Sequence, residues 1–324
     1  MKPVIAITLG DLGGIGPEVT FKALQTFYGQ FRPLILGSAS VLPHISDWIS
    51  PWKIITLHHL PRSKTEVGDE KTITFCDVFS VGEPALGKPS ASNGKTAQAF
   101  LEAAVSLAQN GIVDALCTAP ISKTSMALAG CRFLDHTTFL TDATQSPATS
   151  MAFYTPTLKT VLATVHVPLK QALADICPSL LDKTLANALR FATLLGLAHP
   201  RIALAGLNPH AGEGGLYGTE EIETLIPFIK ANQSEKMTLS GPYPPDTLYH
   251  RAHKGEFDIV LSLYHDQGLI PIKLIAFDDA VNVTLGLPFL RTSPDHGTAF
   301  DLVGQNKANP ASMQAALQFL LDSV

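Results

Sequence analysis

The sequence predicts an α/β protein with a mostly parallel sheet, and three observations lead to this prediction. Short runs of β-branched and apolar residues recur along the 324 residues. Longer segments with a helical pattern lie between many of them, which is typical of βαβ units. Hydrophobic residues make up 46% of the chain and charged residues 16%, so a large core can be buried and long disordered tracts are not expected.

The expected elements alternate along the chain. The expected strands are VIAIT at 4–8, PLILG at 33–37, KIITL at 53–57, VDALCTA at 113–119, TVLATVH at 160–166, RIALAG at 201–206, FDIVLSL at 257–263 and AVNVTLG at 280–286. The expected helices cover 17–28, 93–111, 179–196 and 311–324. Residues 61–90, which contain the alternating runs TITF and DVFSV, predict an irregular excursion or a hairpin. The polar, loop-like stretch 130–147 is the expected hinge region between two α/β domains.

Composition excludes several classes of protein. The net charge of -5 argues against a nucleic-acid-binding surface, while local basic pockets for an anionic metabolite stay open. The four cysteines show no CxxC spacing, so neither a zinc ribbon nor a disulfide framework is expected, and a reducing cytoplasm fits. The N-terminus is expected to be a first strand and not a signal peptide. No uncharged apolar stretch reaches the length of about 18 residues that a membrane span requires.

A glycine-rich segment, GDLGGIGPE at 10–18, directly follows the first expected strand. Glycines at such a turn let the backbone approach a ligand closely, and Pro17 suits the first turn of the next helix. The alternative is a tight turn that requires positive φ angles. The segment is not GxGxxG, so the usual dinucleotide-binding fingerprint is absent.

Three of the eleven histidines occupy equivalent positions in the predicted fold. His166, His210 and His265 each end or closely follow an expected strand, where α/β proteins bind ligands. Three converging imidazoles would suit a zinc-like ion with an open position for substrate. The alternative is that each is an ordinary hydrogen-bonded histidine. A fourth, His136, lies in the polar motif LDHTTF.

Polar residues late in the chain are further candidates for binding or proton transfer. They are Asp246, Asp266, Lys273, Asn282 and Arg291. Lys273 lies in the apolar run IPIKLIAF, so it either reaches the surface or serves as an anion ligand or proton-transfer group. Arg291 follows another apolar run and could bind a phosphate or carboxylate. The polar stretch 295–310 predicts a long functional loop.

Six motifs follow one another along the chain. They are GDLGGIGPE, CTAPISK at 117–123, DHTTFL at 135–140, GLNPHAGEGG at 206–215, YHDQGLIPIK at 264–273 and LGLPFLRTSPDHGTAFDL at 285–302. In this order they resemble those of the 4-hydroxythreonine-4-phosphate dehydrogenase (PdxA) family of pyridoxal phosphate biosynthesis. The last motif also resembles the cofactor loop of isocitrate and isopropylmalate dehydrogenases. The resemblance implies two α/β/α domains with mostly parallel sheets, as in that group. We expect a cofactor-side domain of 1–130 plus 285–324 and a metal-binding, dimerisation domain of 131–284.

The resemblance also implies roles for individual residues. The implied metal ligands are His166, His210 and His265, the last expected from the partner subunit of a homodimer whose active site lies at the interface. The implied substrate contacts are His136, Thr137, Lys273, Asn282 and Arg291. The implied catalytic residues are Lys273, Asp266 and Asp246. The general base is either Lys273, or Asp266 acting through a water molecule. The implied cofactor contacts are His296, Gly297, Thr298, Asp301 and Asn309.

The activity implied is oxidation of 4-phosphooxy-L-threonine with NAD, or alternatively NADP, and one divalent ion (Zn, Mg or Co). The β-keto acid formed decarboxylates to 3-amino-2-oxopropyl phosphate. Two substitutions depart from the family motif GHTEFL, since Asp135 and Thr138 replace Gly and Glu; Leu9, Leu12 and Gly13 likewise depart from PGDPAGIGPE. Phosphorylated threonate or erythronate is therefore an alternative substrate. Two functions of other classes are alternatives. A metal-dependent hydrolase would have no use for the 295–310 loop. A non-catalytic phosphometabolite sensor would not need the three histidines.

Overall fold

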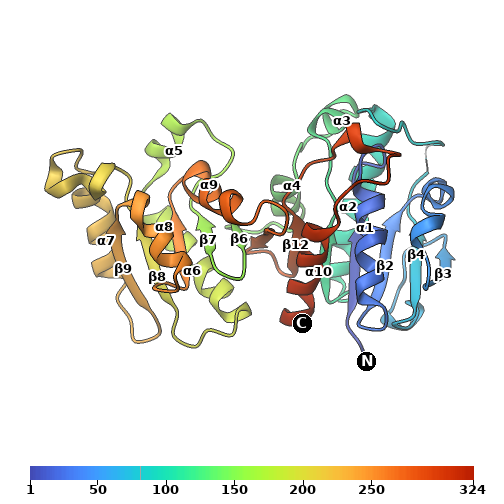
Figure 1. The fold of residues 1–324 in the computed structure, drawn as a ribbon, viewed down its shortest axis with the longest axis horizontal. Coiled ribbons are helices and arrows are strands. Elements are labelled where there is room, and N and C mark those ends of the chain that lie inside the picture. The colour runs from blue at the N-terminus through green and yellow to red at the C-terminus, as the bar shows by residue number, and fades with distance from the viewer. Residues whose placement is uncertain (81) are drawn as a thin grey trace. The chain divides into compact units, whose positions relative to one another are not determined.

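The chain divides into two compact units. The computed structural model describes residues 1–80 and 82–324. Unit 1 comprises Met1–Pro147 and Leu287–Val324, and unit 2 comprises Ala148–Gly286. Each is an α/β unit with a largely parallel sheet, which confirms the predicted fold class (Figure 1). Residues 131–147, which the sequence assigned to the metal-binding domain, belong to unit 1. No helix in the described part of the chain is long and apolar enough to cross a membrane.

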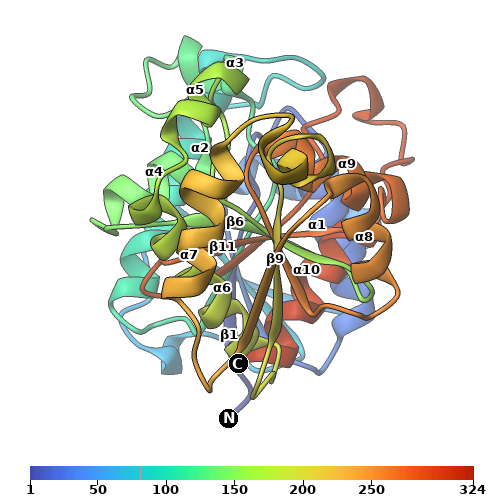
Figure 2. The ribbon, with the colours of Figure 1, turned by 90° about the vertical axis from the view of Figure 1, so that its left-hand side faces the viewer.

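The sheet of unit 1 has the strand order β3-β4-β2-β1-β5-β12, and its neighbouring strands pair in parallel. The strands are β1 (Val4–Thr8), β2 (Arg32–Gly37), β3 (Lys53–Leu57), β4 (Thr72–Asp77), β5 (Ala115–Thr118) and β12 (Leu290–Pro294). The helices are α1 (Gly16–Leu24), α2 (Ala91–Gln109), α3 (Lys123–Leu128), α4 (His136–Ala143) and α10 (Ala311–Ser323). Helices α1 and α10 cover one face of this sheet and α2 the other (Figures 1 and 2). Strands β1, β2 and β5 are therefore buried along their whole length, which explains their continuous apolar sequences.

The sheet of unit 2 has the order β11-β6-β7-β10-β8-β9. Strands β7, β10, β8 and β9 pair in parallel, and β6 is antiparallel to both β11 and β7. The strands are β6 (Ser150–Tyr154), β7 (Lys159–Leu162), β8 (Arg201–Ala205), β9 (Thr238–Tyr243), β10 (Ile259–Ser262) and β11 (Val281–Leu285). The helices are α5 (Leu169–Asp175), α6 (Pro178–Leu194), α7 (Ile226–Ala231), α8 (Pro245–His253) and α9 (His265–Ile275). Figure 2 shows α6 and α7 on one face of this sheet and α8 and α9 on the other.

Two sequence-based predictions are wrong in part: the hairpin alternative for 61–90 and the loop-like character of 130–147. The excursion at 61–90 contains β4, which pairs in parallel with both β2 and β3, so it is not a hairpin. Val81, the last residue of the DVFSV run, lies outside the described residues. The expected hinge loop at 130–147 contains α4, because the Asp135 carboxylate accepts a hydrogen bond from Thr138 N at 3.0 Å and caps the helix.

Parallel strands bring distant segments to one edge of each sheet, because their carboxyl ends share that edge. In unit 1 this edge carries the glycine-rich turn after β1 and the loop 295–310 after β12. In unit 2, His166, His210 and His265 follow β7, β8 and β10, and Asp246 follows β9. The topology thus places every candidate metal ligand beyond the carboxyl end of a parallel strand in unit 2.

Candidate active site

A buried arginine lies beside the end of β5 in unit 1. Arg291, on β12, is 1% exposed, and its Nε and Nη2 donate hydrogen bonds to Thr118 Oγ1 at 3.2 and 2.5 Å. Burial lowers the pKa of Arg291 to about 10, so the guanidinium is still protonated at neutral pH. A buried cation is costly unless an anion or strong hydrogen bonds compensate for the loss of water. Arg291 therefore suits a phosphate or carboxylate ligand.

His136 belongs to the same cluster. It is the first residue of α4, and its Nε2 is buried with no hydrogen-bond partner among the described residues. Burial, and then the nearby Arg291 charge, hold the pKa of His136 well below its ordinary value, against a backbone hydrogen bond at Ala119. The imidazole is thus neutral, and a bound ligand could satisfy Nε2. Thr137 follows in the first turn of α4, where its carbonyl accepts the Thr141 hydroxyl at 2.7 Å.

Two of the three candidate metal ligands meet in unit 2. The ring centroids of His166 and His265 are 5.7 Å apart, with 42° between the ring planes. Nδ1 of His265 lies 2.7 Å from Oδ1 of Asp266. Carboxylates often orient metal-binding histidines in this way, and the contact leaves Nε2 of His265 to bind an ion. Both rings line a pocket of about 300 Å³ together with Val165 and Leu169. The donor set fits a divalent ion.

His210 does not join this pair within one chain. It is exposed on the turn Pro209–Gly215, with its ring 6.0 Å from that of Tyr217. Across residues 1–80 and 82–324, no group of three or more His, Cys, Asp and Glu side chains is arranged to hold a metal. The single chain therefore contains a histidine pair and a separate third histidine.

The acidic and amide candidates of unit 2 lie in different surroundings. Asp246 and Asp266 line one pocket of about 460 Å³ between α8 and α9. Lys273 lies farther along α9, with Nζ 5.2 Å from the centroid of the Phe277 ring. Asn282 is on β11, and its Oδ1 is buried without a hydrogen-bond partner in the described part of the chain. That oxygen can accept a hydrogen bond from a ligand.

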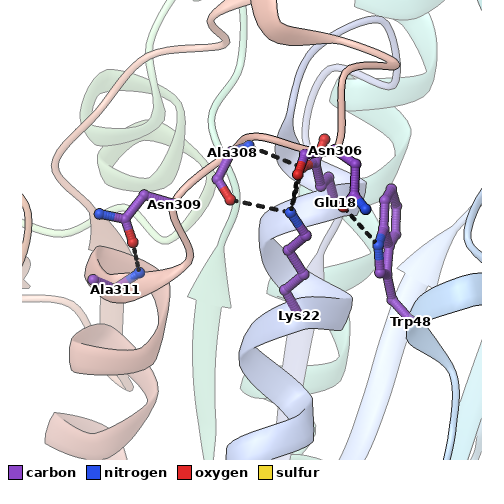
Figure 3. Close-up of polar contacts among 7 residues, drawn as sticks. All are labelled: Glu18, Lys22, Trp48, Asn306, Ala308, Asn309 and Ala311. Carbon is purple, nitrogen blue, oxygen red and sulfur yellow. Dashed lines mark hydrogen bonds and ion pairs between the residues drawn. The ribbon is translucent and has the colours of Figure 1, made fainter.

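The loop 295–310 is fastened to α1 (Figure 3). Glu18 Oε1 accepts hydrogen bonds from Lys22 Nζ at 2.6 Å and from the backbone N–H of Ala308 at 2.9 Å. Lys22 Nζ also donates to the carbonyls of Asn306 at 3.1 Å and Ala308 at 3.3 Å. The side chains of one helical turn thus fix the C-terminal half of the loop.

The predicted cofactor contacts lie along this loop. His296 Nδ1 lies 2.9 Å from the Gly297 carbonyl oxygen, and a Cβ added at Gly297 would meet open space. Asp301 is exposed. Asn309 Oδ1 accepts a hydrogen bond at 3.0 Å from the backbone N–H of Ala311, the first residue of α10 (Figure 3). Open space beside a glycine and an exposed carboxylate fit a dinucleotide.

The glycine-rich turn packs against its own chain. Gly10 has φ +65°, and a Cβ there would lie 2.2 Å from the carbonyl oxygen of Pro120. A Cβ on Gly14 would lie 2.7 Å from the carbonyl oxygen of Thr298, which accepts a hydrogen bond from Ile15 N at 2.9 Å. Among the glycines of this turn only Gly10 has the positive φ that the tight-turn interpretation requires; Gly13, Gly14 and Gly16 are needed because other parts of the chain lie where a Cβ would be.

Sequence reasoning singled out none of the three buried carboxylates of the described residues, which are Asp11, Glu18 and Glu221. Asp11 accepts hydrogen bonds from Ser125 Oγ at 2.5 Å and Gly13 N at 2.9 Å, and burial raises its pKa. Glu221 is 1% exposed and contacts the segment before His210. Glu221 and Leu225 are four residues apart and both buried. A carboxylate at a buried helical position is the signal that could have identified it.

Fold and site together define an α/β enzyme for a small anionic substrate. Residues 29–320 match the family described as "Pyridoxal phosphate biosynthetic protein PdxA". The 4-hydroxythreonine-4-phosphate dehydrogenase of Desulforapulum autotrophicum is 39% identical over 320 residues, covering 98% of this chain and 94% of that protein. The D-threonate 4-phosphate dehydrogenase of Cupriavidus necator is 39% identical over 321 residues, covering 98% and 96%.

The structural comparison agrees with the sequence comparison. The crystal structure of 4-hydroxythreonine-4-phosphate dehydrogenase from Klebsiella pneumoniae has a TM-score of 0.85 and 36% identity, covering 100% of this chain and 99% of that one. The chain therefore belongs to the PdxA family of NAD-dependent dehydrogenases. Members of this family use NAD and a divalent metal. The family resemblance drawn from the six motifs is confirmed.

Proposed function

We propose that this dehydrogenase oxidises 4-phosphooxy-L-threonine to a β-keto acid, which decarboxylates to 3-amino-2-oxopropyl phosphate in pyridoxal phosphate biosynthesis. The observation that carries the proposal is the buried Arg291 guanidinium next to a neutral His136, whose Nε2 has no hydrogen-bond partner among residues 1–80 and 82–324. Such a pair binds an anionic group by charge and by directed hydrogen bonds. Asn282 Oδ1, which has no hydrogen-bond partner in the described part of the chain, can accept a hydrogen bond from the amino group of this substrate.

Phosphorylated threonate is the second candidate substrate, and a specific observation favours it. Asp135 and Thr138 stand where the family motif has Gly and Glu, directly beside His136 and Thr137. A relative with 39% identity is named D-threonate 4-phosphate dehydrogenase. A hydroxyl in place of the amino group could donate to Asn282 equally well.

His166, His210 and His265 would hold the divalent ion. Imidazole donors suit zinc or cobalt better than magnesium, which prefers oxygen ligands. When bound, the ion supplies a Lewis acid at the reacting hydroxyl oxygen, and NAD supplies the hydride acceptor. The Asp266 carboxylate orients His265 through Nδ1.

Residues of the chain then bind the substrate and move its proton. Arg291, His136 and Thr137 would hold the anionic groups of the substrate. Oxidation removes a hydride from the carbon and a proton from its hydroxyl. The proton acceptor is Asp266, through water, or Lys273 on the same helix. Asp246 lines the same pocket as Asp266 and is the further candidate for proton transfer.

His296, Gly297, Thr298, Asp301 and Asn309 would contact the cofactor. The exposed Asp301 carboxylate can accept hydrogen bonds from a ribose hydroxyl and would repel the additional phosphate of NADP. NAD is therefore the expected cofactor.

A homodimer would complete the metal site. Helix α9 begins with His265 and exposes Ile270, Leu274 and, just beyond its end, Phe277, with exposed fractions of 65%, 84% and 70%. Such a cluster of exposed apolar side chains is typical of an interface. A second copy that covers this face brings His265 to the interface, where the partner could complete the ligand set. The rings of His166 and His265 of one chain have their centroids 5.7 Å apart. This proximity favours the alternative, in which both ligands come from the same subunit.

A substrate screen tests the proposed function. NADH formation is measured with 4-phosphooxy-L-threonine, D-threonate 4-phosphate and erythronate 4-phosphate, and with the phosphate-free form of each as a control. Only phosphorylated substrates should reduce NAD efficiently, and 4-phosphooxy-L-threonine should have the highest kcat/KM. A higher value for D-threonate 4-phosphate selects the second candidate. Phosphate release without NADH would indicate a hydrolase, and tight binding without turnover a sensor.

A further inference from the structure

The turn that carries His210 has a backbone conformation that L-amino acids rarely adopt. All five residues of 210–214 have positive φ angles, between 41° and 79°. Three of them, His210, Ala211 and Glu213, have a Cβ that this left-handed conformation brings close to the following carbonyl oxygen. A run of such residues persists only where surrounding groups hold it, and strained segments of this kind cluster at functional sites.

The buried carboxylate of Glu221 contacts this turn and the two residues that precede it. It is 1% exposed and comes from the helical turn Glu221–Leu225. Oε1 accepts hydrogen bonds from the backbone N–H groups of Leu207 and Asn208, each at 2.8 Å. Oε2 accepts from Asn208 Nδ2 at 2.8 Å and lies where a Cβ on Gly212 would be only 2.8 Å away. The carboxylate therefore contacts both the start and the middle of the segment.

We infer that Glu221 is a positioning residue that holds the left-handed turn so that His210 is presented to the divalent ion. The inference rests on the proposed function, which assigns His210 to that ion. The two backbone hydrogen bonds fix the direction in which the chain leaves β8, one and two residues before Pro209. The close approach at Gly212 fixes the curvature of the turn. Glu221 acts through His210 and is not itself a ligand.

Zinc affinity, measured by competition with a chromophoric chelator, tests this assignment without turnover. Glu221→Gln keeps the size of the side chain but replaces one acceptor oxygen with an NH2 donor. We expect zinc to bind about 10- to 100-fold more weakly, as when a group that orients a metal ligand is lost. The double variant Glu221→Gln/His210→Ala should bind zinc no more weakly than His210→Ala alone, because Glu221 acts only through His210.

Three results would overturn the inference. Two of them concern Glu221 alone, and the third also concerns the proposed function. Wild-type zinc affinity in Glu221→Gln, or losses that multiply in the double variant, would show that Glu221 does not position His210. Wild-type affinity in His210→Ala would instead remove His210 from the metal site, and the proposed function would lose that ligand as well.

A rescue experiment separates positioning of the turn from general stability. Ala211 has φ +52°, which glycine adopts without the penalty that a Cβ brings. Ala211→Gly added to Glu221→Gln should restore zinc affinity by about 5-fold. Ala231→Gly, at the end of α7, is the matched control and should restore nothing. Equal effects of both glycines would contradict the inference.

If Glu221→Gln does not fold, Asn208→Ala can be used to test the same inference. It removes the hydrogen bonds from Asn208 Nδ2 to Glu221 at 2.8 Å and to Glu220 at 2.7 Å, while both backbone partners of the Glu221 carboxylate remain. We expect a smaller loss of zinc affinity that Ala211→Gly reverses and that disappears in the His210→Ala background. An unchanged affinity would overturn the assignment.

Discussion

Asp135, which departs from the family motif, is expected to stabilise helix α4 and to weaken the binding of a phosphorylated substrate. Its carboxylate caps α4 by accepting a hydrogen bond from Thr138 N at 3.0 Å. Its charge also acts on Arg291, where it raises the pKa of the guanidinium against the larger effect of burial. A carboxylate that attracts this guanidinium competes with an incoming phosphate. The aspartate is therefore expected to stabilise the helix at some cost in substrate affinity.

Replacing Asp135 with asparagine separates these two effects. Asparagine caps helices as well as aspartate does, so Asp135→Asn should leave Tm unchanged. Loss of the charge should lower KM for a phosphorylated substrate by about 2- to 5-fold, because a partly exposed charge contact contributes less than about 1 kcal/mol. Asp135→Ala, the control, should also lose about 1 kcal/mol of stability. A higher KM in Asp135→Asn would contradict this account.

If Arg291 binds the phosphate as proposed, its pKa sets an alkaline limit to substrate binding. Arg291 is protonated below its pKa of about 10 and loses its charge as the pH rises through that value. The KM of a phosphorylated substrate should therefore rise in this range, while that of its phosphate-free form changes less. Cys117, which faces Arg291, has a pKa raised to about 12 by burial and does not titrate there. Constant KM up to alkaline pH would show that Arg291 does not bind the phosphate.

At the scale of elements, the loop 295–310, which we propose contacts the cofactor, is fixed by α1. Glu18 holds both Lys22 and the backbone of Ala308, so it links the helix to the loop 295–310 (Figure 3). Glu18→Gln keeps an acceptor for Ala308 N and removes the ion pair. Glu18→Ala removes both.

We expect KM for NAD to rise more in Glu18→Ala than in Glu18→Gln, by about 10-fold if one buried hydrogen bond costs about 1.4 kcal/mol. The KM of the phosphorylated substrate serves as the internal control and should change little in either variant. Equal KM values for NAD in both variants and the wild type would mean that the contacts of Glu18 with Lys22 and Ala308 do not affect NAD binding.

The sequence predicted elements well where burial is continuous. Strands β1, β2 and β5 are apolar throughout because helices cover both faces of their sheet. Helix α4 was missed because its sequence, HTTFLTDA, is largely polar, although Asp135 and Thr138 have the spacing of an N-terminal cap. The turn at 209–215 could not be predicted, because a left-handed run that includes His210, Ala211 and Glu213 contradicts their intrinsic preferences.

At the scale of the whole molecule, strand topology accounts for the part of the site that sequence could predict. His166 and His265 follow adjacent parallel strands, so their proximity follows from the order of β7 and β10. His210 follows the next strand, β8, yet its position depends on the strained turn and on Glu221. Sequence spacing carries no information about either. The family motifs predicted the three histidines as ligands, and the geometry of the turn that carries the third required the structure.

The subunit that supplies His265 can be identified by mixing inactive variants. His166→Ala and His265→Ala subunits are each expected to be inactive, because each lacks one ligand. If His265 comes from the partner, one site in each heterodimer has all three ligands, and exchange should restore activity. A mixture of wild-type subunits with each variant is the control for exchange. Proven heterodimers without activity would place His166 and His265 of one chain in the same site.

The most direct test of the central claim is the simultaneous measurement of NADH and CO2 formed from 4-phosphooxy-L-threonine, before and after chelation of divalent metal. A metal-dependent oxidative decarboxylase should form one CO2 for each NADH, lose both products on chelation and regain both when zinc or cobalt is added back. Full NADH formation by metal-free protein, or product formation without reduction of NAD, would contradict the account.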